Sequence, residues 1–344
     1  MIRVLLAEDS LTVRQLLVEQ LQSDSGIEVV GQANNGAEAV ELAWRLRPDI
    51  VAMDVHMPVL DGLDATKEIM VRSPVPIVLI SSSSSPGDVE LALNAMRAGA
   101  LMVLEKPDDP RSARFDGRRQ QLIQMVKAMA QVKVVRRWAP RRERTAAPAA
   151  PPRRGDPIRL VAVAASTGGP AVLQRVLSDL PGDFPAPVLV VQHIATGFVG
   201  GLADWLNGSS ALRVKVAEDG EALMPHVAYL SPDNRHLGAK LPGHIELSDA
   251  PPVGGFRPSG TYLFESAARL RGPALAALIL TGMGSDGVAG LHKVREAGGT
   301  VLAQDEESSV VFGMPRDAVA AGVVNAVLGV EEIAPRLVAL AREA

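Results

Sequence analysis

The sequence predicts an α/β protein made of two doubly wound domains, each built on a mostly parallel sheet. Short apolar runs alternate with helical patterns along most of the chain, which is typical of parallel sheets covered by helices on both faces. The alternation stops clearly once, at residues 136–157, where Pro, Ala and Arg dominate. A Pro-rich, charged stretch is typical of a linker, so we expect domains at residues 1–135 and 158–344.

The first domain is predicted to hold five parallel strands joined by helices. The strands are residues 3–8, 28–33, 50–55, 76–81 and 101–106. Helical patterns fill the gaps between them, for example at Leu11–Gln22 and Gly36–Leu46, and a further helix is expected before the linker.

The second domain shows the same alternation of strand and helix patterns. Its predicted strands are residues 158–164, 187–193, 213–217, 226–230, 274–281 and 300–304, and its predicted helices are residues 170–180, 259–270 and 286–298. The segments "HLGAK" and "HIELSD" indicate a hairpin, so we expect an antiparallel edge on this sheet.

The composition narrows the classes of protein that fit. A chain of 344 residues with 47% hydrophobic residues buries sizeable cores and is not a disordered protein. The formal net charge of −4 gives no reason to expect a nucleic-acid partner, although the arginines of the linker leave that alternative open. The chain contains no cysteine, which excludes disulfides and thiolate chemistry. We find no secretory signal and no apolar run that spans a membrane, and expect a cytoplasmic protein.

Polar side chains are predicted at the carboxyl ends of four strands in the first domain, where open α/β sheets bind ligands. They are Glu8, Asp9, Asp54, Ser81 and Lys106. Three carboxylates form an oxygen site suited to Mg²⁺, and a nearby lysine and hydroxyl suit phosphorylation of one of them. Any single member has an alternative interpretation as a turn or capping residue.

Residues 1–106 resemble the receiver domain of bacterial two-component response regulators. The segments "LLAEDS", "MDVHMPVLDGL", "PIVLISS" and "EKP" carry the resemblance. It implies that Asp54 is the phosphoacceptor, that Glu8 and Asp9 hold Mg²⁺ with it, that Ser81 is the switch hydroxyl, and that Lys106 contacts the phosphoryl group.

In the second domain, "VAVAASTGGP" at residues 161–170 is a predicted strand that ends in a hydroxyl and a glycine pair. Ser166 is a nucleophile, a phosphate-cradling residue or a helix N-cap. His193 ends the next predicted strand, and Asp286 follows a buried strand in "LTGMGSDG", where it is otherwise a helix N-cap. Because consecutive parallel strands are often neighbours, the three side chains are placed to form a catalytic triad.

The glycine-rich turns around this site provide backbone N–H groups. Those of the "STGGP" turn and of "TGMG" are placed to hold an oxyanion. The alternative is a phosphate site of a nucleotide-dependent enzyme, although the chain has no Walker pattern.

The second domain resembles the catalytic domain of the chemotaxis protein-glutamate methylesterases over residues 158–344. The segments "ASTGGP", "VVQHI", "PPVGGFRPS", "LTGMGSDGVAG" and "AQDEESSVVFGMPRDAV" carry the resemblance. It implies that Ser166 is the nucleophile, His193 the general base and acid, and Asp286 the residue that orients it, with an oxyanion hole at the N–H groups of Thr167 and Met283. Receiver, linker and hydrolase in this order is the architecture of that family.

This resemblance implies a phosphorylation-activated serine hydrolase that demethylates glutamate γ-methyl esters, and deamidates glutamines, on chemoreceptors. The implied partners are the receptors and a receptor-coupled histidine kinase, with no nucleic acid and no membrane insertion. Mg²⁺ is expected for phosphorylation and no cofactor for ester hydrolysis. Three other functions stay open: a docking module without activity, a nucleotide-dependent enzyme and a DNA-binding regulator.

Four positions depart from the patterns of these two families. Val103 stands where many receivers have an aromatic switch residue, which argues against signalling by a ring flip. Ala164 replaces a glycine before Ser166, and the small residue is expected to be accommodated. Phe256 and Thr261 stand where the methylesterases often have His and Asp, which puts any role of these positions in substrate fit in question.

Overall fold

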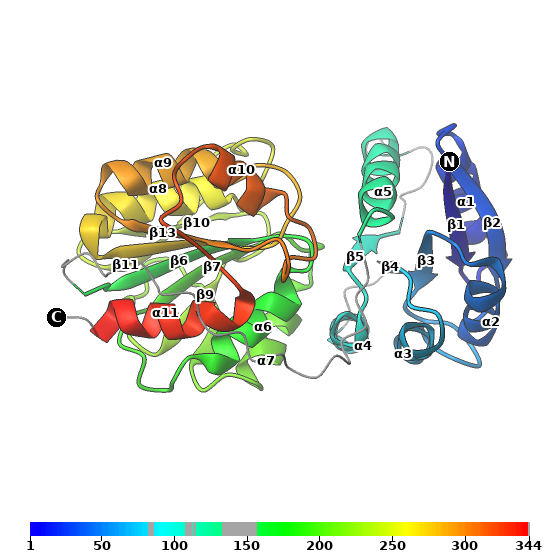
Figure 1. Cartoon of the computed structure of the whole chain (residues 1–344), viewed down its shortest axis with the longest axis horizontal. Helices are drawn as coiled ribbons and strands as arrows, with labels where there is room; N and C mark the ends of the chain where they lie inside the picture. The colour runs from blue at the N-terminus through cyan, green and yellow to red at the C-terminus, as the bar shows by residue number, and fades with distance from the viewer. Residues whose placement is uncertain (82–85, 107–111, 113–114, 133–156, 343–344) are drawn as a thin grey trace. The chain divides into compact units, whose positions relative to one another are not determined.

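The computed structural model describes residues 1–81, 86–106, 112, 115–132 and 157–342. The chain divides into two compact units, Met1–Arg137 and Trp138–Ala344, drawn from blue to cyan and from green to red in Figure 1. The predicted linker lies outside the described residues except for Pro157. The boundaries of the two domains and of the linker therefore stay predictions.

The first unit is a five-stranded parallel sheet with the strand order β2-β1-β3-β4-β5. Its elements are β1 (Ile2–Ala7), α1 (Leu11–Gln22), β2 (Ile27–Ala33), α2 (Gly36–Leu46), β3 (Ile50–Asp54), α3 (Gly62–Arg72), β4 (Ile77–Ser81), α4 (Pro86–Ala98), β5 (Met102–Glu105) and α5 (Phe115–Met129). All five predicted strands are confirmed. The strand order reverses between β1 and β3, so the ligand crevice of this unit lies at their carboxyl ends.

The second unit contains a seven-stranded sheet with the order β14-β13-β12-β6-β7-β9-β8, in which every pairing is parallel. Its strands are β6 (Leu160–Ala165), β7 (Val188–Gln192), β8 (Arg213–Val216), β9 (Val227–Leu230), β12 (Leu275–Ile279), β13 (Thr300–Gln304) and β14 (Ala326–Leu328). Strand β6 lies in the middle, between β12 and β7. The chain leaves β6 toward β7 and returns to β12 on the other side, so the crevice of this unit opens at the end of β6.

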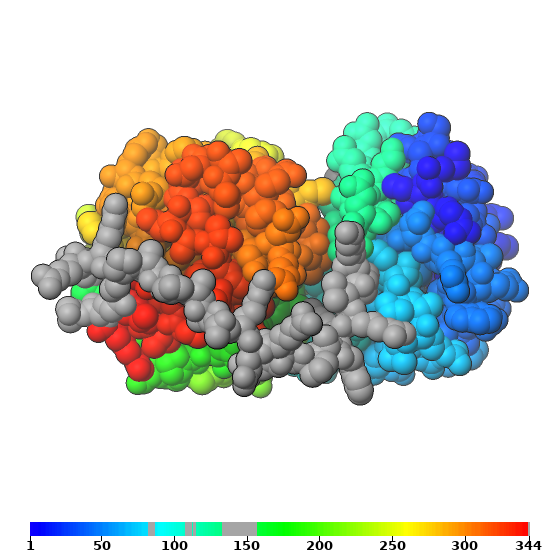
Figure 2. All heavy atoms as spheres, in the orientation of Figure 1, coloured from blue at the N-terminus to red at the C-terminus, as the bar shows by residue number. Residues whose placement is uncertain are grey.

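Helices cover both faces of this sheet. They are α6 (Gly169–Asp179), α7 (Val199–Asn207), α8 (Gly260–Arg271), η1 (Gly272–Ala274), α9 (Val288–Glu296), α10 (Met314–Ala320) and α11 (Val330–Arg342). Figure 1 shows α8, α9 and α10 on one face and α6, α7 and α11 on the other. The main core cluster joins buried residues of β6, β7, β12 and β13 to residues of α8. Figure 2 shows the α10–α11 region, orange to red, spread over one side of the unit.

The predicted antiparallel edge of this sheet is wrong. Strands β10 (His236–Lys240) and β11 (His244–Ser248) pair antiparallel with each other in a separate two-stranded sheet. Strand β10 is buried over four of its five residues because it packs against α8. A Cβ on Gly238 would lie 2.9 Å from Ser266 Oγ, which shows how close the approach is. Within the described residues, no helix is long and apolar enough to cross a membrane.

Candidate functional site

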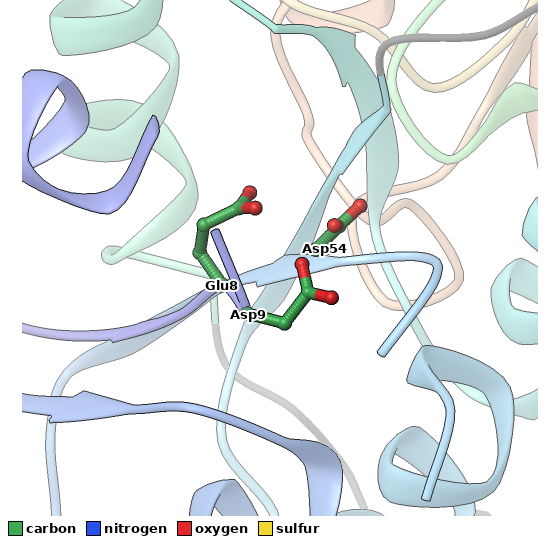
Figure 3. Close-up of side chains that lie close together, drawn as sticks. All are labelled: Glu8, Asp9 and Asp54. Atoms are coloured by element: carbon green, nitrogen blue, oxygen red, sulfur yellow. The ribbon is translucent and has the colours of Figure 1, made fainter. Parts of the chain in front are cut away.

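The predicted acidic residues of the first unit meet at the carboxyl ends of β1 and β3, as Figure 3 shows. Glu8 and Asp9 follow β1 directly, and Asp54 is the last residue of β3. One carboxylate oxygen from each lies within 4.8 Å of the others. Glu8 and Asp54 are buried while Asp9 is exposed, so the cluster is open to solvent on one side. These oxygens fit the ligand preference of Mg²⁺.

Lys106 follows β5 and completes this crevice. Its Nζ lies 2.7 Å from Glu8 Oε2 and 2.7 Å from Asp54 Oδ2. Burial lowers the pKa of Lys106, but its hydrogen bonds to Asp54 and Glu8 outweigh this effect and raise it. Burial raises the pKa of Glu8, and the charge of Asp54 adds to that, against the lowering effect of Lys106. Three carboxylates face one ammonium in this crevice, so negative charge is left over, which favours an added cation.

The predicted switch hydroxyl lies beside the same crevice. Ser81 is the last residue of β4 and is buried, and its carbonyl accepts a hydrogen bond of 2.8 Å from the N–H of Lys106. Residues 82–85, which follow it, lie outside the described residues. Val103 is buried in β5, so this position offers an aliphatic side chain and no ring.

Ser166 follows β6 directly and begins a tight turn. Its N–H donates to Thr281 O at 3.0 Å, and its carbonyl accepts from Gly169 N at 2.8 Å. Gly168 adopts φ 75°, a left-handed conformation that glycine adopts without strain. Gly168 is the N-cap of α6 and no side chain caps this helix, so the alternative of Ser166 as an N-cap is wrong.

His193 takes the equivalent place at the end of the neighbouring strand β7. Ala165 pairs with Gln192 in the parallel ladder, so Ser166 and His193 are the next residues along two adjacent strands. The His193 N–H donates to Ala165 O at 3.0 Å. The Gln192 amide group donates to Ser166 O at 2.8 Å and to His193 O at 2.7 Å. This buried amide fixes the two backbones together, and sequence reasoning missed it.

Asp286 lies beside the imidazole of His193, with 3.0 Å between its Oδ2 and His193 Nε2. It does not cap α9, whose N-cap is Gly287, so that alternative is wrong. Instead it accepts hydrogen bonds from Ser259 Oγ and from Gly260 N, both at 2.7 Å, at the start of α8. Burial raises the pKa of Asp286, but the contact with His193 and these hydrogen bonds outweigh it and lower the pKa. The carboxylate is therefore held ionised.

The "TGMG" segment lies against the turn at Ser166. A Cβ placed on Gly282 would lie 2.7 Å from Ser166 Cβ, so only glycine fits there. Thr281 Oγ1 donates to Thr167 O at 2.9 Å and accepts from Val311 N at 2.9 Å. Thr281 thus joins the turn at Ser166 to the segment that contains Val311. Thr167 and Met283 thus belong to segments that adjoin Ser166, and the oxyanion hole at their N–H groups stays a prediction.

Two of the family departures are accommodated by their neighbours. A Cβ on Gly260 would lie 2.7 Å from the methyl of Ala164, so the absence of a side chain at Gly260 makes room for Ala164. Thr261 is buried, and its Oγ1 accepts a hydrogen bond of 2.9 Å from Gly287 N while its own N–H points to Asp286 Oδ1 at 3.2 Å. Thr261 thus supports the loop that carries Asp286.

The first unit therefore has the fold and acidic crevice of a receiver domain, and the second has a parallel α/β fold with Ser, His and Asp gathered at one crevice. Residues 161–337 match the family described as CheB methylesterase, and residues 4–114 match the response regulator receiver domain. The chain belongs to the family of protein-glutamate methylesterase/protein-glutamine glutaminases.

Individual relatives agree with this assignment over nearly the full chain. The chain is 52% identical to protein-glutamate methylesterase/protein-glutamine glutaminase 4 of Myxococcus xanthus, covering 98% of this chain and 96% of the relative. It is 51% identical to protein-glutamate methylesterase/protein-glutamine glutaminase 3 of Anaeromyxobacter dehalogenans, and the match covers 98% of this chain and 98% of the relative. The crystal structure of the Thermotoga maritima CheB methylesterase catalytic domain is 40% identical with a TM-score of 0.52, covering 53% of this chain and 98% of that domain.

Proposed function

We propose that the chain hydrolyses glutamate γ-methyl esters on chemoreceptors, deamidates receptor glutamines by the same route, and is activated by phosphorylation of its receiver domain. The observation that carries the proposal is the position of Ser166 and His193 on adjoining strand ends, with Asp286 3.0 Å from the imidazole. The family assignment supports the substrate class, since the relatives are named for these two reactions.

In the first half of the reaction, Ser166 Oγ attacks the ester carbonyl carbon while its proton passes to His193. Nε2 of His193 faces Asp286, so Nδ1 is the nitrogen left to take this proton. The N–H groups of Thr167 and Met283 donate to the oxyanion that forms on the carbonyl oxygen. The carbon–methoxy bond then breaks, and His193 returns the proton to give methanol and an acyl-enzyme.

In the second half, water attacks the acyl carbon and gives its proton to His193, and Ser166 leaves with that proton to release glutamate. With a glutamine side chain the first leaving group is ammonia in place of methanol. Asp286 stays ionised because of its lowered pKa, so it stabilises the imidazolium that forms in each half. General acid–base assistance of this kind supplies roughly 10²–10⁴-fold in rate.

In the receiver domain, Asp54 accepts the phosphoryl group from a receptor-coupled histidine kinase. Glu8, Asp9 and Asp54 would hold Mg²⁺, since their oxygens lie within 4.8 Å of one another. Bound there, Mg²⁺ would supply positive charge to neutralise the phosphoryl oxygens and so assist the transfer. Lys106, which already contacts Asp54, moves to the phosphoryl oxygens, and the Ser81 hydroxyl responds to the new anion.

The proposed organisation is a receiver domain at residues 1–135, a linker at 136–157 and a methylesterase domain at 158–344. The partners are methyl-accepting chemoreceptors and the kinase that serves them. We place the reaction in the cytoplasm, because the proposed substrate glutamates lie on cytoplasmic helices of the receptors. The matched family gives no reason to invoke a nucleic-acid partner.

The test is methanol release from methylated receptor by the wild type and by Ser166→Ala, each with and without a small-molecule phosphodonor and Mg²⁺. We expect stimulation of the wild type by the donor and a loss on the order of 10⁴–10⁶ in the variant. Activity retained by Ser166→Ala would exclude Ser166 as the nucleophile. No release by the wild type under either condition would favour a hydrolase for another ester or a docking module.

A further inference from the structure

Phe256 lies flat against the imidazole of His193. The two ring centroids are 4.5 Å apart and the planes differ by 8°, which is a parallel stack. Phe256 is only half-buried, unlike Phe184, Phe198 and Phe264, which are fully buried in the core. The stack of Phe256 on His193 therefore lies at the edge of the buried core and not inside it.

The backbone on both sides holds this ring in place. Val253 and Phe256 exchange two backbone hydrogen bonds of 3.0 Å, closing a turn in which Gly254 and Gly255 have φ of 59° and 88°. On the other side, the Arg257 guanidinium donates to Asn234 Oδ1 at 3.0 Å and to Asp249 O at 3.0 Å. Phe256 is therefore fixed between two tied points and does not depend on burial for its position.

The same short segment also reaches Asp286. Ser259, three residues after Phe256, donates its hydroxyl to Asp286 Oδ1 at 2.7 Å. One segment of chain thus contacts both residues of the proposed His–Asp pair. It contacts His193 through a ring face and Asp286 through a hydroxyl. This coupling sets the imidazole plane and the carboxylate from a common backbone.

The contact with Asp286 alone leaves the imidazole under-determined. Nε2 lies close to the line of the Cβ–Cγ bond, so a contact there still allows the ring to rotate about that bond, which changes where Nδ1 points. A flat stack removes this freedom because tilting the imidazole opens a gap against the neighbouring ring. Proton transfer needs donor and acceptor within a narrow range of distance and angle, so the plane of His193 bears on the rate.

We propose that Phe256 is a positioning residue that holds the plane of the His193 imidazole so that Nδ1 faces Ser166. The proposal rests on the proposed hydrolase function and deepens it. Phe256 acts through His193 and takes no proton itself. Its loss slows each proton transfer and leaves binding of the receptor helix nearly unchanged.

The test measures kcat and KM for methanol release by the full chain. Phe256→Leu and Phe256→Met keep an apolar side chain and remove the flat face, and we expect kcat to fall about 10- to 100-fold with KM changed less than about twofold. Phe256→Tyr keeps the flat face, and we expect it to retain kcat within about threefold of the wild type. Both Phe256→Leu and Phe256→Met are measured because one of them could misfold, and the thermal unfolding curve of each variant reports whether it has.

Tyr262→Leu is the matched control. Tyr262 stacks on His236 with centroids 4.6 Å apart and planes 16° apart, so the variant removes an equivalent stack from a buried histidine with no proposed role. We expect its kcat to stay within about twofold of the wild type. A loss equal to that of Phe256→Leu would make the effect one of domain packing and overturn the proposal.

A fluorophosphonate probe separates the two levels of the account without any receptor. Its phosphorus forms a bond to Ser166 Oγ as the P–F bond breaks, the Oγ proton passes to His193 and fluoride leaves. We expect rapid labelling of the wild type, none of Ser166→Ala, and slow labelling of Phe256→Leu. The positioning role alone would be refuted if the wild type and Phe256→Leu had equal labelling rates and equal kcat. It would also be refuted if Phe256→Tyr were labelled as slowly as Phe256→Leu. A wild type that neither labels nor releases methanol would refute the proposed function, and the positioning role with it.

Discussion

The two crevices of this chain form at the same place in their sheets, but the pKa of a buried carboxylate is shifted in opposite directions in them. Both lie at the carboxyl ends of parallel strands where the strand order reverses. In the first, burial and the neighbouring Asp54 raise the pKa of Glu8 despite Lys106. In the second, burial is outweighed by His193, Ser259 and Gly260, and the pKa of Asp286 is lowered.

The two sites differ in whether the protein itself provides the groups that stabilise the buried carboxylate. Around Asp286 the protein supplies its own donors, a hydroxyl at 2.7 Å and a backbone N–H at 2.7 Å, so the carboxylate is stable as it stands. Around Glu8 the described cluster holds three carboxylates and one lysine, so negative charge remains. A preorganised catalytic site needs the first arrangement, and a site that takes up a cation and a phosphoryl group needs the second.

We expect the largest loss of activity from a change at Asp286, whose charge is fully stabilised by its neighbours. Asp286→Asn removes the charge that faces His193 while keeping the size of the side chain, and we expect kcat for methanol release to fall about 10³–10⁴-fold. Labelling of Asp54 by a phosphodonor serves as the control and should not change. A loss of less than about tenfold would show that Asp286 does not orient the base.

The second prediction concerns Asp54. Asp54→Asn should abolish formation of the acyl phosphate and the stimulation by phosphodonor and Mg²⁺, while basal methanol release stays at the wild-type level. Radiolabel incorporation and methanol release on the same preparations check the two parts. Stimulation that survives in this variant would place the phosphoacceptor elsewhere.

A smaller effect is expected at Glu8. Glu8→Gln removes a buried charge that is disfavoured in the folded state, so the receiver should become more stable without Mg²⁺ and lose its stabilisation by Mg²⁺. Amide hydrogen exchange in β1 and β3 of the intact chain measures this, with exchange slowed a few-fold in the variant. Faster exchange in Glu8→Gln than in the wild type would mean that its pairing with Lys106 outweighs its burial.

The smallest effect is the pH dependence, and its sign differs between the crevices. The folded pKa of Glu8 lies above its unfolded value, so its ionisation costs stability near neutral pH and the cost fades as pH falls through the raised pKa. The folded pKa of Asp286 lies below its unfolded value, so its contribution is lost only as pH falls through that lowered pKa.

Urea unfolding of the full chain from about pH 7 to about pH 5 tests both signs. The stability difference between wild type and Glu8→Gln should shrink across this range, and that between wild type and Asp286→Asn should stay constant. A constant difference for Glu8→Gln would contradict the raised pKa.

Local patterns in the sequence were sufficient to predict most of the fold. The predicted bounds of α1, α2 and β13 agree with the structure, because apolar periodicity and capping residues such as Ser10 and Asn35 mark them locally. Strand β14 was missed because it has three residues and none of them is buried. The placement of the β10–β11 hairpin on α8 was missed because it depends on a long-range contact at Gly238.

The candidate site was predicted only in part, for a related reason. Ser166, His193 and Asp286 follow buried strands, and strand ends are visible in a sequence. The supports of the site are not, because Ser259 lies 27 residues from Asp286 and reads as an ordinary N-cap, while Gln192 reads as the end of a strand. The stack of Phe256 on His193 likewise joins distant parts of the chain through a turn whose path no local pattern fixes.

The most direct test of the central claim, that Ser166 and His193 act as one hydrolytic unit, is a double-mutant cycle on methanol release. We predict that Ser166→Ala, His193→Ala and the double variant lose activity to about the same residual level, because a second removal costs nothing once the unit is broken. Losses that multiply in the double variant would contradict the account, since the two residues would then contribute independently.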